Sequence, residues 1–379
     1  MRKLAVLLLL PLIFGCGSQS SEKAESSNIL ENLTFTVDTV MVDSGKDILN
    51  LAWGLRLADV SSDRRSLFLF NEKDYSIAKI DLDKLKLEVI SKFDKEGPNG
   101  IGQFITGIQA LNNGGFFFKG FRANSIVNAK GELENKINLT SENIQGLSKE
   151  LEVHASSDLL VGSDAKHFFS LPGDFMDGER DFLVATYLDQ KGKILDIPAM
   201  DIIGRFKIIW KDPEIQSAFL EQLSLQQFGG IVVIRSSATS EIYLYDVVSD
   251  SLNLVSYKHK LVPNRKDAQV RNEVSTQNEF QNEIGKLTTQ VGFEKFLWDE
   301  QSQQFFRFGR SFLPIEGLNK KQKSDVYLFA YDKDFKLIGE TQLKDLTSVP
   351  AYPFFKDGKL WSYVNVEDEL GFAVMDFKF

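Results

Sequence analysis

Cysteine is nearly absent from this sequence of 379 residues, since the only one is Cys16, close to the N-terminus. A chain with one thiol cannot form an internal disulfide, so a disulfide-stapled fold is excluded. Histidine is almost as scarce, and His154, His167 and His259 lack the paired spacing of a zinc site. We therefore predict no metal ligands, and the sequence identifies no cofactor.

Motifs of the common catalytic classes are also missing. No Gly-x-Ser-x-Gly nucleophile elbow occurs, and the glycine-rich stretch 96–102 lacks the Lys-Ser/Thr of a phosphate-binding loop. A Ser-His-Asp triad stays open, because its members need not be close in the chain. We assign no catalytic residue, which favours a non-enzymatic function and leaves an enzyme as the alternative.

Basic clusters are absent apart from the short stretch 319–323, and the formal charge of the chain is −9. Affinity for nucleic acid depends on neutralising phosphates, so we expect no nucleic-acid partner. Arg2 and Lys3 precede an apolar run from Leu4 to Phe14, which is shorter than the roughly 20 residues that span a bilayer as a helix. This pattern is typical of a secretory signal peptide, which we place at residues 1–15.

The end of this signal carries a more specific pattern. Ile13-Phe14-Gly15-Cys16 resembles the bacterial lipoprotein box. The resemblance implies that Cys16 is the lipid attachment site and that acyl chains hold the protein on a membrane. The alternative is an ordinary signal peptide with an incidental cysteine.

The residues after Cys16 predict where the protein is held. Residues 17–28 are small and polar, so we expect residues 16–30 to form a flexible tether. Gly17 stands where an aspartate would retain a lipoprotein at the inner membrane. We therefore expect a cell-envelope lipoprotein of the outer membrane. The sequence leaves open whether it faces the periplasm or the cell surface.

Phenylalanine is abundant, with 31 residues, and many of them are neighbours in the sequence, as in 116–118, 168–169, 305–306 and 354–355. Adjacent residues of a strand point to opposite faces of the sheet. Adjacent aromatics therefore indicate strands that are covered on both faces, as in stacked sheets.

A weak unit of three strands with tight polar turns recurs six times, and 66–90 shows it completely. This repeat predicts an all-β fold, a six-bladed β-propeller over residues 31–379, with seven blades as the lesser option. The segment 33–43 alternates like a strand but has no hairpin partner nearby. We expect it to pair with the C-terminal strand and so close the ring.

Two stretches carry a family resemblance. Residues 92–118, KFDKEGPNGIGQFITGIQALNNGGFFF, resemble the blade junction of six-bladed NHL- and TolB-like propeller lipoproteins of Bacteroidetes. Residues 293–308, FEKFLWDEQSQQFFRF, are similar to a stretch of one uncharacterised family in that group. The resemblance implies a propeller, but the family brings no established activity and no catalytic residue.

Two segments are predicted to be short helical insertions. Residues 211–224 have Asp212 as a helix N-cap and Pro213 at the first helical position. Residues 268–287 place apolar side chains on roughly one helical face. Such insertions often lie over the mouth of a propeller channel, where we expect functional residues.

The most suggestive binding residues follow the second insertion. The candidates are Trp298, Asp299, Arg307 and Arg310, with Arg122 and Asn124 as weaker additions. Tryptophan and arginine are enriched at binding hot spots, and arginine can bind a carboxylate or phosphate with two hydrogen bonds. The alternative is that Trp298 packs between blades while the arginines pair with nearby carboxylates.

These observations predict a lipid-anchored envelope propeller that acts as a binding or scaffolding module. Its partner is expected to be an envelope protein or a small-molecule ligand. The alternative is an NHL-like propeller enzyme, a metal-dependent lactonase-type hydrolase or lyase. A sensor partner of a neighbouring gene product is a third possibility, and the sequence leaves the ligand and the oligomeric state open.

Overall fold

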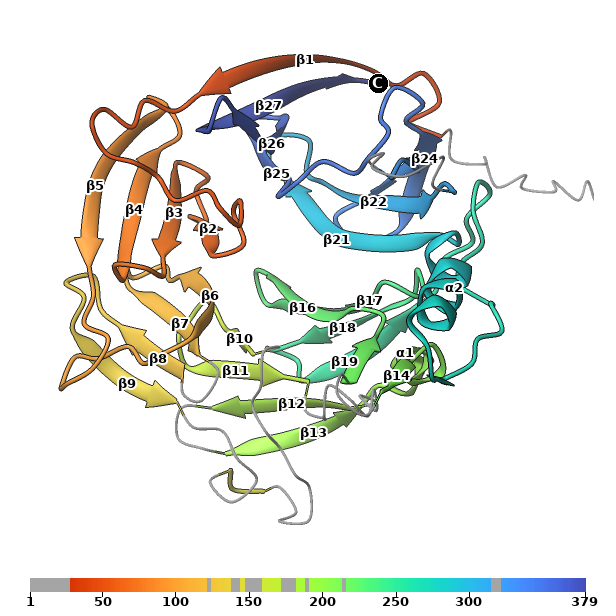
Figure 1. Cartoon of the computed structure of the whole chain (residues 1–379), viewed down its shortest axis with the longest axis horizontal. Helices are drawn as coiled ribbons and strands as arrows, with labels where there is room; N and C mark the ends of the chain where they lie inside the picture. The colour runs from red at the N-terminus through yellow and green to blue at the C-terminus, as the bar shows by residue number, and fades with distance from the viewer. Residues whose placement is uncertain are drawn as a thin grey trace, which may run out of the picture.

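The computed structural model describes residues 28–120, 124–137, 144–146, 159–171, 182–187, 191–212, 216–314 and 322–379. In these parts of the chain, six four-stranded antiparallel sheets stand around a central axis (Figure 1). The predicted all-β propeller fold is therefore confirmed. The predicted signal peptide, Cys16 and most of the tether lie outside the described residues. None of the described helices is long and apolar enough to cross a membrane.

Five of the six sheets are built in chain order from the innermost strand toward the outside (Figure 1). The strands of the first three sheets are β2 (Ala58–Val60), β3 (Ser66–Asn71), β4 (Ser76–Asp81) and β5 (Lys86–Lys92); β6 (Ile105–Ala110), β7 (Phe116–Gly120), β8 (Asn124–Val127) and β9 (Leu133–Ile137); and β10 (Leu160–Val161), β11 (His167–Ser170), β12 (Phe182–Tyr187) and β13 (Gly192–Asp196).

The other three sheets follow the same plan, except that the last one takes its outer strand from the N-terminus. Their strands are β16 (Leu223–Phe228), β17 (Ile231–Ser236), β18 (Ile242–Asp246) and β19 (Ser251–Val255); β21 (Gly292–Asp299), β22 (Gln304–Phe312), β23 (Ser324–Tyr331) and β24 (Leu337–Gln342); and β25 (Phe354–Lys356), β26 (Lys359–Val366), β27 (Glu369–Lys378) and β1 (Thr34–Met41).

The two ends of the described chain meet in this last sheet. β1 pairs antiparallel with β27 along its whole length, from Thr34 opposite Lys378 to Met41 opposite Gly371. The predicted closure by residues 33–43 is confirmed. The chain is already packed before β1, because Asn28 exchanges hydrogen bonds with the backbone of Glu340 and Leu30 is fully buried. Residues 28–30, expected at the end of the tether, thus lie against β24.

The phenylalanine doublets explain how the sheets stack. Phe117 and Phe118 are both fully buried, yet they belong to different apolar clusters on the two faces of their sheet. Phe305 and Phe306 divide in the same way between the clusters on either side of β22. Because each sheet is covered on both faces, a strand can carry adjacent aromatics without exposing either one.

Side chains on the innermost strands tie neighbouring sheets together. Gln226 of β16 accepts a hydrogen bond from the backbone N–H of Phe296 on β21 and donates one to its carbonyl oxygen, both at 2.8 Å. Gln109 of β6 makes the same pair with Val161 of β10. Asp59 of β2 accepts from the N–H of Ala110 on β6. These contacts fix the sheets around the axis, where no strand ladder joins them.

An additional three-stranded sheet lies beside the ring, and two of its strands fall between β13 and β16 in the chain; the β10–β13 and β16–β19 sheets still pack directly on each other. The additional sheet consists of β15 (Gln216–Phe219), β14 (Ile208–Lys211) and β20 (Glu273–Val274), next to the short helices η1 (Pro198–Asp201) and α1 (Ile202–Arg205). The prediction of a helix over 211–224 is wrong, since the described part of this segment forms β15 and the start of β16. Asp212-Pro213 favours a turn as readily as a helix start.

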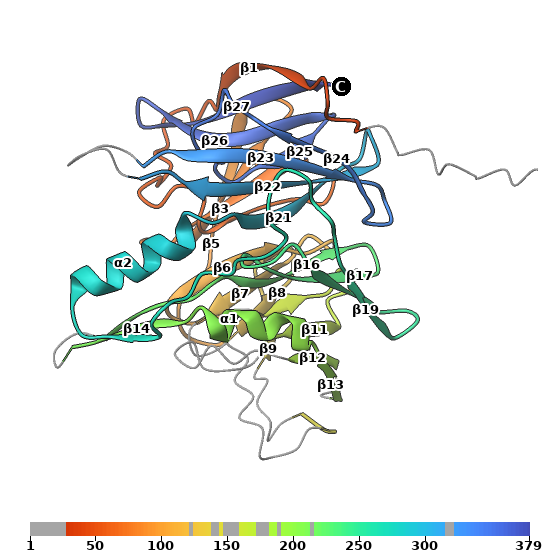
Figure 2. The ribbon, with the colours of Figure 1, turned by 90° about the vertical axis from the view of Figure 1, so that its right-hand side faces the viewer.

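The second predicted helix is present but starts later than expected. α2 spans Gln277–Thr288, and its N-cap Thr276 accepts a hydrogen bond from Glu279, so 268–276 precede the helix. Figure 1 places α2 at the edge of the ring, beside β21, and Figure 2 shows it extending past the strands on one side. The expectation that this insertion lies over the channel mouth is therefore wrong.

Candidate functional site

A cavity of about 930 Å³ occupies the centre of the ring. Residues from the innermost strand of every four-stranded sheet line it: Asp59, Ala110, Leu160, Gln226, Phe296 and Phe354. The strands that start each sheet therefore converge on one shared space. Its size falls within the range of roughly 300–1,000 Å³ found for small-molecule sites.

One wall of this cavity is aromatic. Phe296 and Trp298 of β21 line it, the Phe296 ring being buried between the sheets, while Phe354 begins β25 and Tyr352 lies just before that strand. Trp298 packs against Phe305 with ring centroids 4.5 Å apart, and its indole N–H donates to the carboxylate of Glu300 at 2.6 Å. The wall thus has fixed aromatic surfaces against which an apolar body can pack.

The charged residues of the cavity are mostly cationic. Arg64, Arg235, Lys295 and Arg310 line it, against the two carboxylates Asp59 and Glu294. The whole chain carries a formal charge of −9, so the cavity differs in sign from the rest of the protein. A cavity of one sign attracts ligands of the opposite sign.

Asp59 is the carboxylate with the most perturbed acidity in this cavity. Burial raises its pKa to about 6, although the backbone N–H groups of Ala110 and Val60 and the charges of Arg64 and Lys295 act in the opposite direction. Folding therefore makes the ionised form of Asp59 costly. At neutral pH this carboxylate stays ionised, at a cost in stability.

This pKa predicts a pH-dependent effect of replacing Asp59 with asparagine. The folded protein binds a proton at Asp59 more tightly than the unfolded chain does, so the wild type loses stability as the pH rises from about 4 to about 6. Asp59→Asn lacks this loss. Between pH 4 and pH 7, we therefore expect the free energy of unfolding of the variant to rise by about 2 kcal/mol relative to that of the wild type. Urea unfolding measures this difference.

A matched control is Asp63→Asn, in the turn that follows β2. The hydroxyl of Ser61 and the backbone of Arg65 lower the pKa of Asp63, so its contribution to stability is present at pH 7 and is lost as the pH falls. The stability of Asp63→Asn relative to wild type should therefore fall, not rise, as the pH is raised. An Asp59→Asn variant whose stability follows the wild type in parallel across pH 4–7 would contradict the assignment.

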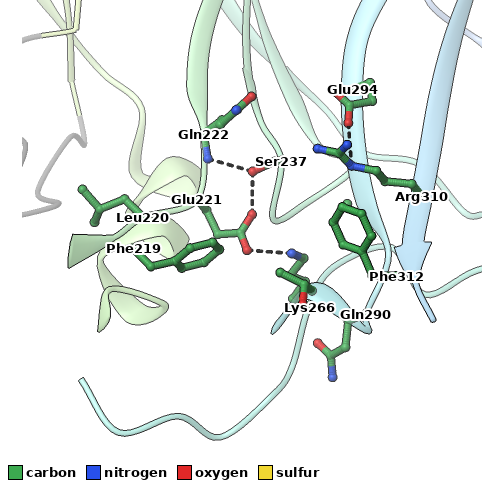
Figure 3. A pocket seen from close by; sticks show the side chains of 12 residues that line it. Phe219, Leu220, Glu221, Gln222, Ser237, Lys266, Gln290, Glu294, Arg310 and Phe312 are labelled. Carbon is green, nitrogen blue, oxygen red and sulfur yellow. Dashed lines mark hydrogen bonds and ion pairs between the residues drawn. The ribbon is translucent and has the colours of Figure 1, made fainter. Parts of the chain in front are cut away.

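A smaller cavity of about 140 Å³ adjoins the central one and shares Gln222, Glu294 and Arg310 with it. Figure 3 shows Glu221 at its centre, reaching both Ser237 and Lys266. The distances are 2.5 Å to the Ser237 hydroxyl and 2.6 Å to the Lys266 ammonium. Both charged side chains of this pair are almost completely buried.

Arginines surround the junction of the two cavities. Arg310 pairs with Glu294 at 3.0 Å, and Glu294 also acts electrostatically on Arg235 and Arg307. Burial and repulsion from Arg307 lower the pKa of Arg235 to about 9. One carboxylate therefore serves three guanidinium groups.

The structure separates the cluster predicted from the sequence. Trp298 and Arg310 line the central cavity, and Arg310 also lines the smaller one. Arg307 is fully buried and donates to the backbone carbonyl oxygens of Glu294, Ser240 and Ser236. Trp298 and Arg310 thus lie in the cavity wall, whereas the guanidinium of Arg307 is engaged by backbone carbonyl groups.

The remaining predicted residues lie elsewhere. Asp299 is buried and accepts hydrogen bonds from the N–H groups of Gln301 and Ser302 in the turn after β21. Asn124 is buried in β8 and accepts from the N–H of Gly120. Arg122 and Cys16 are outside the described residues. Neither Asp299 nor Asn124 lines the central cavity.

Several residues of the site were missed by sequence reasoning. Asp59, Glu221 and Lys266 stand in no recognisable spacing, since their proximity depends on sheets far apart in the chain. Arg235 did leave a signal, as the one charged residue in the apolar run 231–235. A charge in a strand that is covered on both faces indicates a buried polar contact.

A metal centre finds no support in the described parts of the chain. They contain no group of three or more His, Cys, Asp or Glu side chains close enough to hold a metal ion. The alternative of a metal-dependent propeller enzyme therefore lacks a candidate site among these residues.

Comparisons with known proteins agree with this fold. A crystal structure of a DUF4221 family member from Bacteroides vulgatus is similar with a TM-score of 0.62 and 13% identity, covering 91% of this chain and 98% of that one. A second crystal structure, of a Bacteroides fragilis protein described as a "Putative exported protein", matches with a TM-score of 0.49 and 9% identity, covering 91% of this chain and 96% of that one. The comparison with curated proteins finds no match.

The sequence itself carries the family assignment. The family model described as "Domain of unknown function (DUF4221)" matches residues 26–342, from the segment before β1 to the end of β24. The resemblance to an uncharacterised propeller family is therefore confirmed. The chain belongs to the DUF4221 family.

Proposed function

We propose that this protein is a lipid-anchored binding module of the cell envelope that holds a small-molecule ligand in its central cavity. One observation carries the proposal: the cavity of about 930 Å³ is lined by all six four-stranded sheets. An aromatic wall and a few charged groups in a space of this size are the usual features of a ligand site. Rigid sheets on all sides give it a fixed shape.

The proposed location rests on the N-terminal sequence. The lipoprotein box ending at Cys16 and the polar residues 17–27 support a lipid anchor on a short tether, and Gly17 favours the outer membrane. Asn28, at the start of the described chain, lies beside β24 on the outside of the ring. Asn28 itself does not line the central cavity.

Cys16→Ser is expected to release the protein from membranes. A single amino acid at the N-terminus cannot replace acyl chains, each methylene of which contributes about 0.8 kcal/mol to membrane binding. Fractionation of cells into soluble and membrane portions measures the effect, with wild type as the control. Retention of the variant on membranes would contradict the anchor.

The binding function is tested by capture of the natural ligand. The purified protein is incubated with an extract of the producing cells and their medium, and co-purifying small molecules are identified by mass spectrometry. Ser62→Trp introduces a large side chain at the cavity wall, and Val248→Trp introduces the same side chain at a site that is 90% exposed. We expect the same molecule to co-purify with wild type and with Val248→Trp, but not with Ser62→Trp.

The capture experiment has a clear negative outcome. A set of molecules that is the same for wild type and for Ser62→Trp would show that the cavity is not the binding site. A captured envelope protein, retained by Ser62→Trp, would favour a scaffolding function on the outer surface instead.

A further inference from the structure

Arg235 is an unusual residue in the wall of the central cavity. It is 1% exposed, and its guanidinium donates from Nη1 to the carbonyl oxygen of Phe293 at 2.8 Å. Its Nε is buried with no hydrogen-bond acceptor among the described residues. A buried charge without full pairing is expensive, so its surroundings are incomplete without a further acceptor or counter-charge.

The charges around Arg235 do not balance. Arg307 lies close enough to repel it, and the donors of Arg307 go to neutral backbone carbonyl groups. Glu294 is the carboxylate that acts on both, and it already pairs with Arg310. Glu221, the other carboxylate beside the smaller cavity, adds no compensation, because it is already paired with the ammonium of Lys266. The junction of the two cavities is therefore net positive.

Arg310 brings this positive charge to the accessible side. Its side chain is 40% exposed, its Nε faces Glu294, and its guanidinium lies 4.9 Å from the ring centroid of Phe312. Figure 3 shows the end of this guanidinium directed into the smaller cavity. Held by Glu294 and Phe312, it keeps terminal N–H groups available for a ligand.

We propose that the central cavity binds a ligand through a carboxylate or phosphate group. This group contacts Arg310, while the buried Arg235 lies in the wall behind it. This inference rests on the proposed binding function and names the chemistry of the ligand. The planar guanidinium fork of arginine matches both oxyanions and binds them with paired hydrogen bonds. The rest of the ligand packs against Trp298, the partly exposed aromatic side chain of β21 in the cavity wall.

The experiment uses three probes of similar size and different charge. Benzoate, phenyl phosphate and neutral benzamide are titrated into purified protein that lacks residues 1–15. Binding is measured by calorimetry and by the shift in Tm. We expect benzoate or phenyl phosphate to bind at least about tenfold more tightly than benzamide, since hydrogen bonds to charged groups are the stronger ones. Comparison of the two anions shows which oxyanion the site prefers.

Arg310→Gln is the decisive variant, because its partly exposed side chain can be shortened without opening the core. It is expected to weaken binding of the anionic probe about tenfold and to leave benzamide unchanged. Arg65→Gln, an exposed arginine that does not line either cavity, is the matched control and should bind as wild type does. Arg235→Gln is a second variant, expected to lose the anion as well.

The possible failures are distinguishable. Equal binding of benzoate, phenyl phosphate and benzamide, or an anion affinity that Arg310→Gln leaves intact, overturns the oxyanion site while the cavity remains a binding site. If no probe binds, the oxyanion inference is also overturned, and the capture experiment then decides the binding function separately. A captured natural ligand without an acidic group has the same consequence for the inference.

Discussion

Replacing Arg307 with methionine is expected to lower the free energy of unfolding by about 4 kcal/mol. The side chain is completely buried between the β16–β19 and β21–β24 sheets. Its Nη1 and Nη2 donate to the carbonyl oxygens of Ser240 and Ser236, and its Nε donates to that of Glu294. Methionine fills part of the volume but leaves three buried acceptors without a donor.

The cost has two sources. Each buried acceptor that loses its partner costs about 1–3 kcal/mol, partly recovered if water enters. The guanidinium also lies 5.0 and 4.9 Å from the ring centroids of Phe293 and Phe296, and these contacts are lost with the charge. Relief of the repulsion with Arg235 offsets some of the loss. Arg307→Lys keeps the charge but not the three-way geometry, so we expect an intermediate effect.

Urea unfolding at constant pH measures the effect, because the midpoint shifts while the slope stays constant if only stability changes. Arg310→Met is the matched control on the same strand, since its side chain is 40% exposed and makes one ion pair. That change should cost less than about 1 kcal/mol. If the two variants unfold at the same urea concentration, Arg307 does not hold the two sheets together.

The sequence was sufficient to predict the ring and its closure. Strand alternation has a period of two, so Phe117 and Phe118 had to face opposite sides, and the structure buries both. The segment 33–43 was recognisable as a strand without a local partner, and β1 pairs with β27. Both inferences depend on local periodicity and on the need to satisfy strand edges, which a sequence reveals directly.

Helix positions were predicted less well because their signals were ambiguous. The Asp212-Pro213 pair predicts a helix start, but residues 216–219 form β15 beside β14. In the second insertion, Thr276 and Glu279 form a capping pair that sets the first turn of α2. This Thr-x-x-Glu pattern was visible in the sequence and would have moved the start of the helix to the right place.

The candidate site was only partly predictable, for a physical reason. Trp298 and Arg310 were recognisable as residue types that bind ligands, and both line the cavity. Arg307 is of the same type and follows the doublet 305–306 directly, but the strand places it between sheets. Which face of a strand is turned toward the axis depends on the ring, and Asp59 and Arg235 enter the site through contacts between distant sheets.

The buried pair of Lys266 and Glu221 supports the second large prediction. Lys266→Met is expected to lower the free energy of unfolding by about 3–4 kcal/mol, because Glu221 is then a buried carboxylate without a counter-charge. The hydroxyl of Ser237 continues to donate to Glu221 but cannot replace an ammonium group at 2.6 Å.

The double variant Glu221→Gln with Lys266→Met completes a mutant cycle. Glutamine keeps an acceptor for Ser237, and methionine packs as an uncharged chain of similar length, so no unpaired charge stays buried. Replacement of a buried ion pair by neutral residues is often nearly neutral, so we expect the double variant to lie within about 1 kcal/mol of wild type. The comparison is made by urea unfolding of all four proteins at pH 7. If the two single losses simply add, Lys266 and Glu221 act independently, and the short contact between them contributes nothing to stability.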